Sequence, residues 1–98
     1  MNYFFSESAF KDLEDSELYY NNERFGLGEE FLDEVYSAIL HICDDPSIWQ
    51  NIYRDVQRYS LKRFPFKIIY RVEDDTIQIV AINHNKRHPK YWKHKSQD

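Results

Sequence analysis

Residues 66–84 read FKIIYRVEDDTIQIVAINH, and this stretch decides the fold. Two apolar runs, 66–73 and 76–84, are rich in strand-forming residues, and the pair Asp74-Asp75 between them is a turn signal. The runs therefore predict two antiparallel strands joined by a tight hairpin. Apolar residues fall on both faces of each run, which is typical of the central strands of a sheet.

A further strand is expected just before this hairpin. Residues 56–61 have the composition of a strand, and Phe64-Pro65 supplies the following turn because proline fixes φ at the bend. Since the connections are short, the three strands should form an antiparallel meander.

The N-terminal half predicts a short strand over residues 2–5 and then a helix. Ser6 is a natural N-cap for this helix, which is expected to run to about Asn22. Its buried side should carry Phe10, Leu13 and Tyr20.

A glycine-rich turn at 26–28 leads into a second helix. This helix is predicted from near Gly28 to about Asp45, where Asp45-Pro46 ends it. Its apolar residues recur at spacings of three and four, as expected of an amphipathic helix, and they are Phe31, Leu32, Val35, Tyr36, Ile39, Ile42 and Cys43.

These elements predict an α+β fold in which a two-helix hairpin packs on a small antiparallel sheet, with the order β-α-α-β-β-β. The chain has 98 residues, enough for one domain over 1–98. Residues 93–98 are expected to form a loose tail.

Charge is distributed unevenly along the chain. Residues 1–50 carry 2 basic and 12 acidic side chains, a net charge of −10, while residues 51–98 carry 11 basic and 5 acidic ones, a net charge of +6. The fold should therefore have one acidic and one basic face, and the basic face could meet a phosphate backbone or an acidic protein. Alternatively, the two halves neutralise each other within the fold.

Several classes of site are excluded by composition. Cys43 is the only cysteine, so the chain forms no internal disulfide and no zinc site of several thiolates. No apolar run approaches the ~20 residues that span a bilayer and no signal peptide is recognisable, so a cytoplasmic protein without membrane contact is expected. Pro89 argues against metal binding by His84 and His88, and neither a metal nor another cofactor is expected.

Alternation along the strands identifies a candidate binding face. If the larger apolar side chains lie under the helices, Arg58, Lys67 and Arg71 point to the opposite face of the sheet. Basic residues in the neighbouring turns extend this set. The candidate phosphate- or partner-binding residues are Arg58, Lys62, Arg63, Lys67, Arg71 and Lys86.

The C-terminal segment 86–95 interleaves cations with Tyr91 and Trp92, a composition typical of segments that contact phosphates and bases. A solvated basic tail pinned to the core by an aromatic ring is the alternative. It is the preferred reading for Trp92, whereas both readings stay open for Arg87 and Tyr91.

Cleavage of RNA through the 2′-hydroxyl needs a base, an acid and cations on the scissile phosphate. Lys67, His84, Arg87 and Tyr91 include all of these groups, and they are the candidate catalytic residues if the protein is a nuclease. The set is not specific by itself, because these residue types are common on protein surfaces.

Several segments together resemble the RelE/ParE superfamily of toxins. The resemblance spans nearly the whole chain, and its residues share their order and spacing with the family. They are residues 9–13, Tyr19-Tyr20, Gly26-Leu27-Gly28, Phe31-Leu32, residues 58–72, Ile82-Asn83-His84, Arg87, Pro89, Tyr91 and Trp92.

This resemblance implies the toxin of a type II toxin–antitoxin module, neutralised by a cognate antitoxin with which it could form a hetero-oligomer. Members of the superfamily either inhibit DNA gyrase, as ParE does, or cut messenger RNA on the ribosome, as RelE does. Asn85 stands where RelE-like enzymes often carry arginine, and the acidic pI of about 5.5 is unlike that of ribosome-directed toxins. ParE-like action is therefore expected, with a RelE-like endonuclease or a degenerate, non-toxic member as alternatives.

Overall fold

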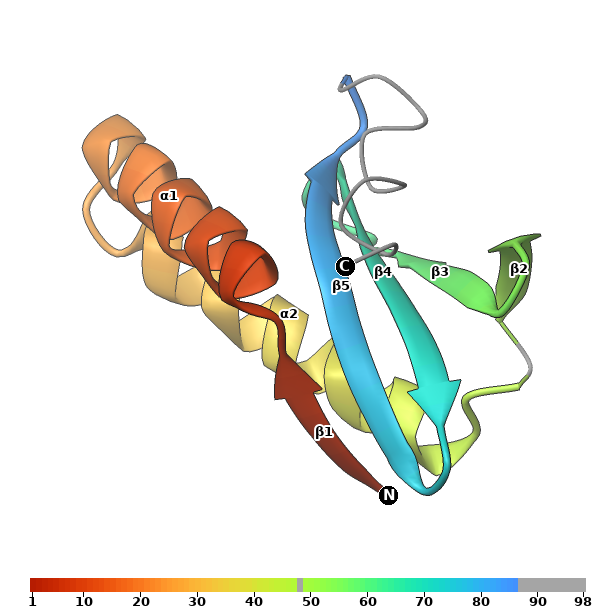
Figure 1. Ribbon diagram of the computed structural model, residues 1–98. Coiled ribbons are helices and arrows are strands. Elements are labelled where there is room, and N and C mark those ends of the chain that lie inside the picture. The colour runs from red at the N-terminus through yellow and green to blue at the C-terminus, as the bar shows by residue number, and fades with distance from the viewer. Residues whose placement is uncertain (48, 87–98) are drawn as a thin grey trace.

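The computed structural model describes residues 1–47 and 49–86 and consists of two helices and a five-stranded sheet (Figure 1). Within these residues, neither helix has the length and apolar character needed to cross a bilayer. The predicted α+β class and helical hairpin are confirmed. In chain order the elements are β1 (Asn2–Phe5), α1 (Glu7–Glu23), α2 (Leu27–Asp44), β2 (Gln50–Tyr53), β3 (Val56–Ser60), β4 (Phe66–Glu73) and β5 (Thr76–His84).

The strands lie in the order β1-β5-β4-β3-β2. The three strands predicted as a meander pair antiparallel, but β1 pairs parallel to β5, with Asn2 opposite Thr76 and Phe5 opposite Ile79. The sheet is therefore mixed rather than antiparallel throughout. The sequence also missed β2, a four-residue strand that pairs with β3 through a tight turn in which Arg54 has a φ of 50°.

Helix α1 begins as predicted, because the Ser6 hydroxyl accepts a hydrogen bond from the N–H of Ala9 at 3.0 Å. Ala9, Asp12 and Leu13 form its buried side. The prediction that Phe10 is buried is wrong, since 45% of this residue is exposed. The helix turns its smaller residues toward β5 and leaves Phe10 at the margin, where its ring contacts that of Phe5.

The turn between the helices depends on two glycines. Gly26 has a φ of 87°, which a residue with a side chain adopts only with strain. At Gly28 the helices approach so closely that a Cβ atom would lie 2.5 Å from the backbone oxygen of Glu17. The Gly28 N–H also donates to the Asn21 side chain at 2.8 Å, which ties the start of α2 to the end of α1.

The main core lies between the helices and one face of the sheet. Helix α2 buries most of the predicted apolar stripe, although 38% of Tyr36 is exposed. Tyr70 of β4 is fully buried, and its hydroxyl donates to the carbonyl of Pro46 at 2.7 Å, which fixes the chain after α2. The sheet supplies to this core Tyr59, Phe66, Ile68, Tyr70, Ile77, Ile79 and Ile82.

A β-bulge in β5 changes which residues face the helices. Ile69 pairs with Ala81 and Tyr70 pairs with Ile79, so Val80 has no partner of its own on β4. Val80 and Ala81 consequently lie on the same face, away from the main core, where they form a second cluster with Val56 and Ile69. From Ile82 onward, the alternation of β5 is reversed relative to a regular strand.

Candidate functional site

The face of the sheet away from the helices, called the outer face below, holds three of the predicted basic residues. Arg58 lies on β3 opposite Ile69, and Lys67 and Arg71 lie on β4 on the same side as Ile69. The outer face is formed by Val56, Arg58, Ser60, Lys67, Ile69, Arg71, Gln78, Val80, Ala81 and Asn83.

The centre of the outer face is apolar. Val56, Ile69, Val80 and Ala81 are at most 1% exposed, and Ile52 and Tyr53 of β2 pack against them. Arg71 lies beside this cluster, and its Nε donates to the Gln78 side chain at 2.9 Å. This apolar cluster is covered, so the outer face offers a partner its basic and polar side chains rather than an apolar surface.

Lys67 occupies the middle of a polar row that crosses three strands. Ser60 of β3 lies opposite it on one side, and Asn83 of β5 lies opposite it on the other. Partial burial lowers the pKa of Lys67, and the nearby charge of Arg58 lowers it further. The neighbouring positive charges of Lys67 and Arg58 therefore favour the binding of an anionic group beside them.

Asn83 was not among the predicted site residues. It is only 1% exposed, and its buried side-chain oxygen has no hydrogen-bond partner among residues 1–47 and 49–86. An unpaired buried acceptor is costly, and it is usually satisfied by a ligand, an ordered water or a movement of a neighbouring donor. Regular alternation from Ile77 would have placed Asn83 in the main core. The sequence did not reveal the bulge that brings Asn83 beside Lys67, so this residue was missed.

His84 lies on the opposite face of the sheet from Lys67. It pairs with Phe66, whose ring packs edge-on against the imidazole at a centroid distance of 5.0 Å. Its Nδ1 accepts a hydrogen bond from the backbone N–H of Lys86 at 2.9 Å. The neutral ring that makes this bond carries its proton on Nε2, so its one basic nitrogen, Nδ1, is engaged by the Lys86 backbone.

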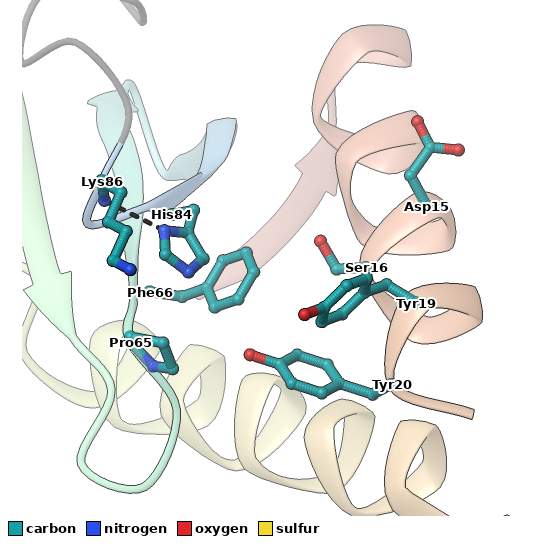
Figure 2. Close-up of a pocket in the computed structure, with 8 residues that line it drawn as sticks. All are labelled: Asp15, Ser16, Tyr19, Tyr20, Pro65, Phe66, His84 and Lys86. Carbon is teal, nitrogen blue, oxygen red and sulfur yellow. Dashed lines mark hydrogen bonds between the residues drawn. The ribbon is translucent and has the colours of Figure 1, made fainter. Parts of the chain in front are cut away.

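A pocket of about 580 Å³ separates His84 from helix α1. Figure 2 shows the hydroxyls of Tyr19 and Tyr20 pointing from α1 toward Phe66 and Pro65. The apolar walls of this pocket and its few hydrogen-bond donors suit an apolar or planar side chain of a partner. The lining residues are Asp15, Ser16, Tyr19, Tyr20, Pro65, Phe66, His84 and Lys86.

The structure thus does not bring together Lys67 and His84, two of the residues proposed for a nuclease. Lys67 belongs to the outer face and His84 to the pocket beneath α1, with the sheet between them. Arg87 and Tyr91 lie outside the described residues.

Two of the predicted binding residues contact α2. The Arg63 guanidinium pairs with Glu30, and this contact holds the pKa of the Glu30 carboxyl below its usual range. Glu34 accepts hydrogen bonds from the backbone N–H groups of Lys62 and Arg63, the shorter at 2.7 Å. Here acidic and basic halves of the chain do neutralise each other. Lys62 also lines a second pocket, which includes Arg58.

Other reactive groups offer no further site in the described part of the chain. No three His, Cys, Asp or Glu residues there are grouped so that they could hold a metal ion. Cys43 packs against the main core, and burial raises the pKa of its thiol, which disfavours the reactive thiolate.

Comparison with known proteins agrees with this architecture. A search of curated proteins finds no match. Among solved structures, the chromosomal ParDE toxin–antitoxin system from P. aeruginosa aligns with a TM-score of 0.75 and 18% identity, over 86% of this chain and 95% of that one. The intact E. coli RelBE complex aligns with a TM-score of 0.66 and 15% identity, over 88% and 98% of the two chains. The isolated E. coli RelE toxin also aligns with a TM-score of 0.66 and 15% identity, over 98% of this chain and 96% of that one.

At these identities the solved structures establish the fold alone. The family model described as the ParE toxin of the type II toxin–antitoxin system parDE matches residues 3–89, which is most of the chain. The chain therefore belongs to the ParE toxin family of type II toxin–antitoxin systems.

Proposed function

We propose that this protein is a cytoplasmic toxin that a cognate antitoxin neutralises, and that it arrests growth by binding DNA gyrase rather than by cutting RNA. The observation that carries the choice of mechanism is the separation of Lys67 from His84. General acid–base cleavage requires both groups within reach of one scissile phosphate, and a folded sheet stands between them. A toxin that acts by binding needs no such assembly.

Family membership supports the same choice. The matching family is that of ParE, and the ParDE system aligns with a higher TM-score than either RelE-containing structure. His84 also engages its Nδ1 with the Lys86 backbone, so the basic nitrogen of the neutral ring already accepts a hydrogen bond.

The outer face is the proposed antitoxin-binding surface. Arg58, Lys67 and Arg71 lie together on this face, and their positive charges fit a segment that carries acidic side chains. An acidic antitoxin would also relieve the repulsion between Lys67 and Arg58.

A RelE-like ribosome-dependent endonuclease is the second candidate. It is favoured by Lys67, because partial burial and a neighbouring cation are the conditions that adapt a lysine to proton transfer near neutral pH. In that case Lys67 would act with Arg87 and Tyr91 instead of His84.

Induced expression distinguishes the candidates when replication and translation are measured in the same culture. For gyrase inhibition, thymidine incorporation should fall first and a DNA-damage reporter should respond, while methionine incorporation continues. The purified protein should also inhibit supercoiling by gyrase. Early translation arrest with cut transcripts, abolished by Tyr91→Phe or Arg87→Ala, would instead establish the nuclease. Unchanged growth would identify a degenerate member.

The antitoxin surface is tested by co-purification with the acidic product of the neighbouring gene. Charge reversal at Arg58, Lys67 and Arg71 should release that protein. Lys11→Glu is the matched control, because Lys11 is an exposed residue on α1, far from the outer face. If all three reversals leave the complex intact, the surface has been assigned wrongly.

A further inference from the structure

Within the described residues, strand β1 forms one edge of the sheet. It is the outermost strand beside β5, and Figure 1 shows it at the margin of the sheet. Edge strands usually carry a charged residue, a proline or a bulge that prevents pairing with another chain. The four residues of β1, NYFF, include no charge and no proline, and their register with β5 is regular.

The free edge offers a short set of backbone groups. The N–H of Ser6 donates to the carbonyl of Ile79 at 3.0 Å, so Ser6 directs its backbone toward β5. Because successive residues of a strand alternate, Phe4 also faces β5, whereas Tyr3 and Phe5 direct their N–H and C=O groups away from it. Two donors and two acceptors therefore line this edge.

Aromatic side chains surround the same edge. The ring of Phe5 contacts the rings of Tyr3, Phe10 and Tyr36 at centroid distances of 5.8 to 6.1 Å, so the four form one cluster. Tyr3, Phe10 and Tyr36 are 37%, 45% and 38% exposed. Phe4, on the other face of the sheet, is 46% exposed.

We propose that two copies of this chain associate through β1, which pairs antiparallel with β1 of the second copy about a two-fold axis at Phe4. Tyr3 and Phe5 are placed symmetrically around Phe4. In this register Tyr3 of each copy therefore exchanges both backbone hydrogen bonds with Phe5 of the other. All four groups on each free edge become paired, and the two sheets become continuous.

The side chains fit the same register. The two Phe4 residues form a non-hydrogen-bonded pair, whose Cα atoms lie about 4.5 Å apart, so their rings meet on one face. Taking about 200 Å² for each ring, the exposed fractions of Tyr3, Phe4, Phe10 and Tyr36 leave roughly 330 Å² of ring surface per copy. Met1 and Leu40, 53% and 62% exposed, add to this surface. The total approaches the ~1,000 Å² at the lower limit of specific interfaces, so a dimer of micromolar affinity is expected.

Sedimentation equilibrium of the purified chain should show a reversible monomer–dimer equilibrium between about 1 and 500 µM. Edge pairing involves no charge on β1, so added salt should not weaken it. A dimer held by the basic C-terminal half on the acidic helices would dissociate with salt, and that result would overturn the proposal.

Charge substitution at the two-fold axis gives the sharpest test. Phe4→Lys and Phe4→Glu should each be monomeric, because they place like charges directly opposite each other. An equimolar mixture of the two should dimerise again. Circular dichroism establishes that each variant is folded, and failure of the mixture to associate while both are folded would overturn the proposal.

A cross-linking test remains decisive if the charged variants do not fold. In a Cys43→Ser background, Phe4→Cys should form a disulfide-linked dimer under mild oxidation, since a Cα separation near 4.5 Å lies within the range that a disulfide spans. Ser8→Cys, at an exposed position on α1, is the matched control and should not cross-link. Equal cross-linking of both variants, or none in Phe4→Cys, would contradict the two-fold pairing.

Discussion

Helix α1 is fastened to the edge of β5 by a buried carboxylate, and replacing Asp12 measures that attachment. Strand β1 ends at Phe5, opposite Ile79, so none of the described strands pairs with the following part of β5 on that side. There the Oδ2 of Asp12 accepts a hydrogen bond from the N–H of Ile82 at 3.2 Å, in a side chain that is only 8% exposed. A helix side chain thus takes the place of the missing strand.

Asp12→Ala leaves the Ile82 N–H buried without this acceptor. An unsatisfied buried group costs about 1–3 kcal/mol. A loss of about 2 kcal/mol corresponds to a fall in Tm of roughly 8–16 °C for a domain of this size. Asp12→Asn retains a side-chain oxygen that can accept this hydrogen bond, so its free energy of unfolding should fall clearly less than that of Asp12→Ala.

Urea unfolding followed by far-ultraviolet circular dichroism gives the free energy of unfolding for each variant. Asp15→Ala is the matched control, because Asp15 lies on the same helix and forms only an exposed ion pair with Lys11. Its loss should not exceed about 0.5 kcal/mol. If Asp12→Ala and Asp15→Ala lose the same free energy, the hydrogen bond to Ile82 does not hold α1 in place.

Three further substitutions test other contacts. Gly28→Ala should lower the free energy of unfolding by about 1–3 kcal/mol in urea, because its Cβ would meet the backbone oxygen of Glu17; an unchanged midpoint would show that the helices separate easily. Glu34→Ala should lower the free energy of unfolding by about 1 kcal/mol or more, since two N–H groups of the turn at 62–63 lose their acceptor. Glu34→Gln should lower it less, and equal losses in the two variants would contradict the role of Glu34 as that acceptor. Burial and a nearby cation lower the folded-state pKa of Lys67, so its charge opposes folding below that pKa and stability rises as Lys67 deprotonates. Lys67→Met should therefore be more stable than wild type at pH 7, with the difference shrinking toward alkaline pH, and lower thermal stability at pH 7 would refute this.

The sequence predicted those elements whose signals are local. Ser6 specifies the start of α1, the stripe of α2 follows helical spacing, and Asp74-Asp75 marks the last hairpin. It did not predict that β1 pairs with β5, because a four-residue strand with three aromatic residues carries no information about a partner more than 70 positions away. It missed β2 because four residues, QNIY, lack the length and the alternation of a recognisable strand.

The candidate site was predicted on β4 and misassigned on β5. Lys67 lies where alternation places it, because β4 itself remains regular beside the bulge. His84 was grouped with Lys67, and a regular β5 that buries Ile77 and Ile79 would indeed have turned His84 to the outer face. The unpaired Val80 reverses this order and presents Asn83 there instead. No residue type in that strand, with neither glycine nor proline, marks the irregularity.

That single unpaired residue gives the scaffold two possible surfaces for one sequence. If Val80 were paired with Ile69 in a regular strand, Asn83 would turn to the main core and His84 to the outer face, whereas deleting Val80 would leave Asn83 opposite Lys67. Relatives of the same length in which this residue is paired would thus present different chemistry on the same framework.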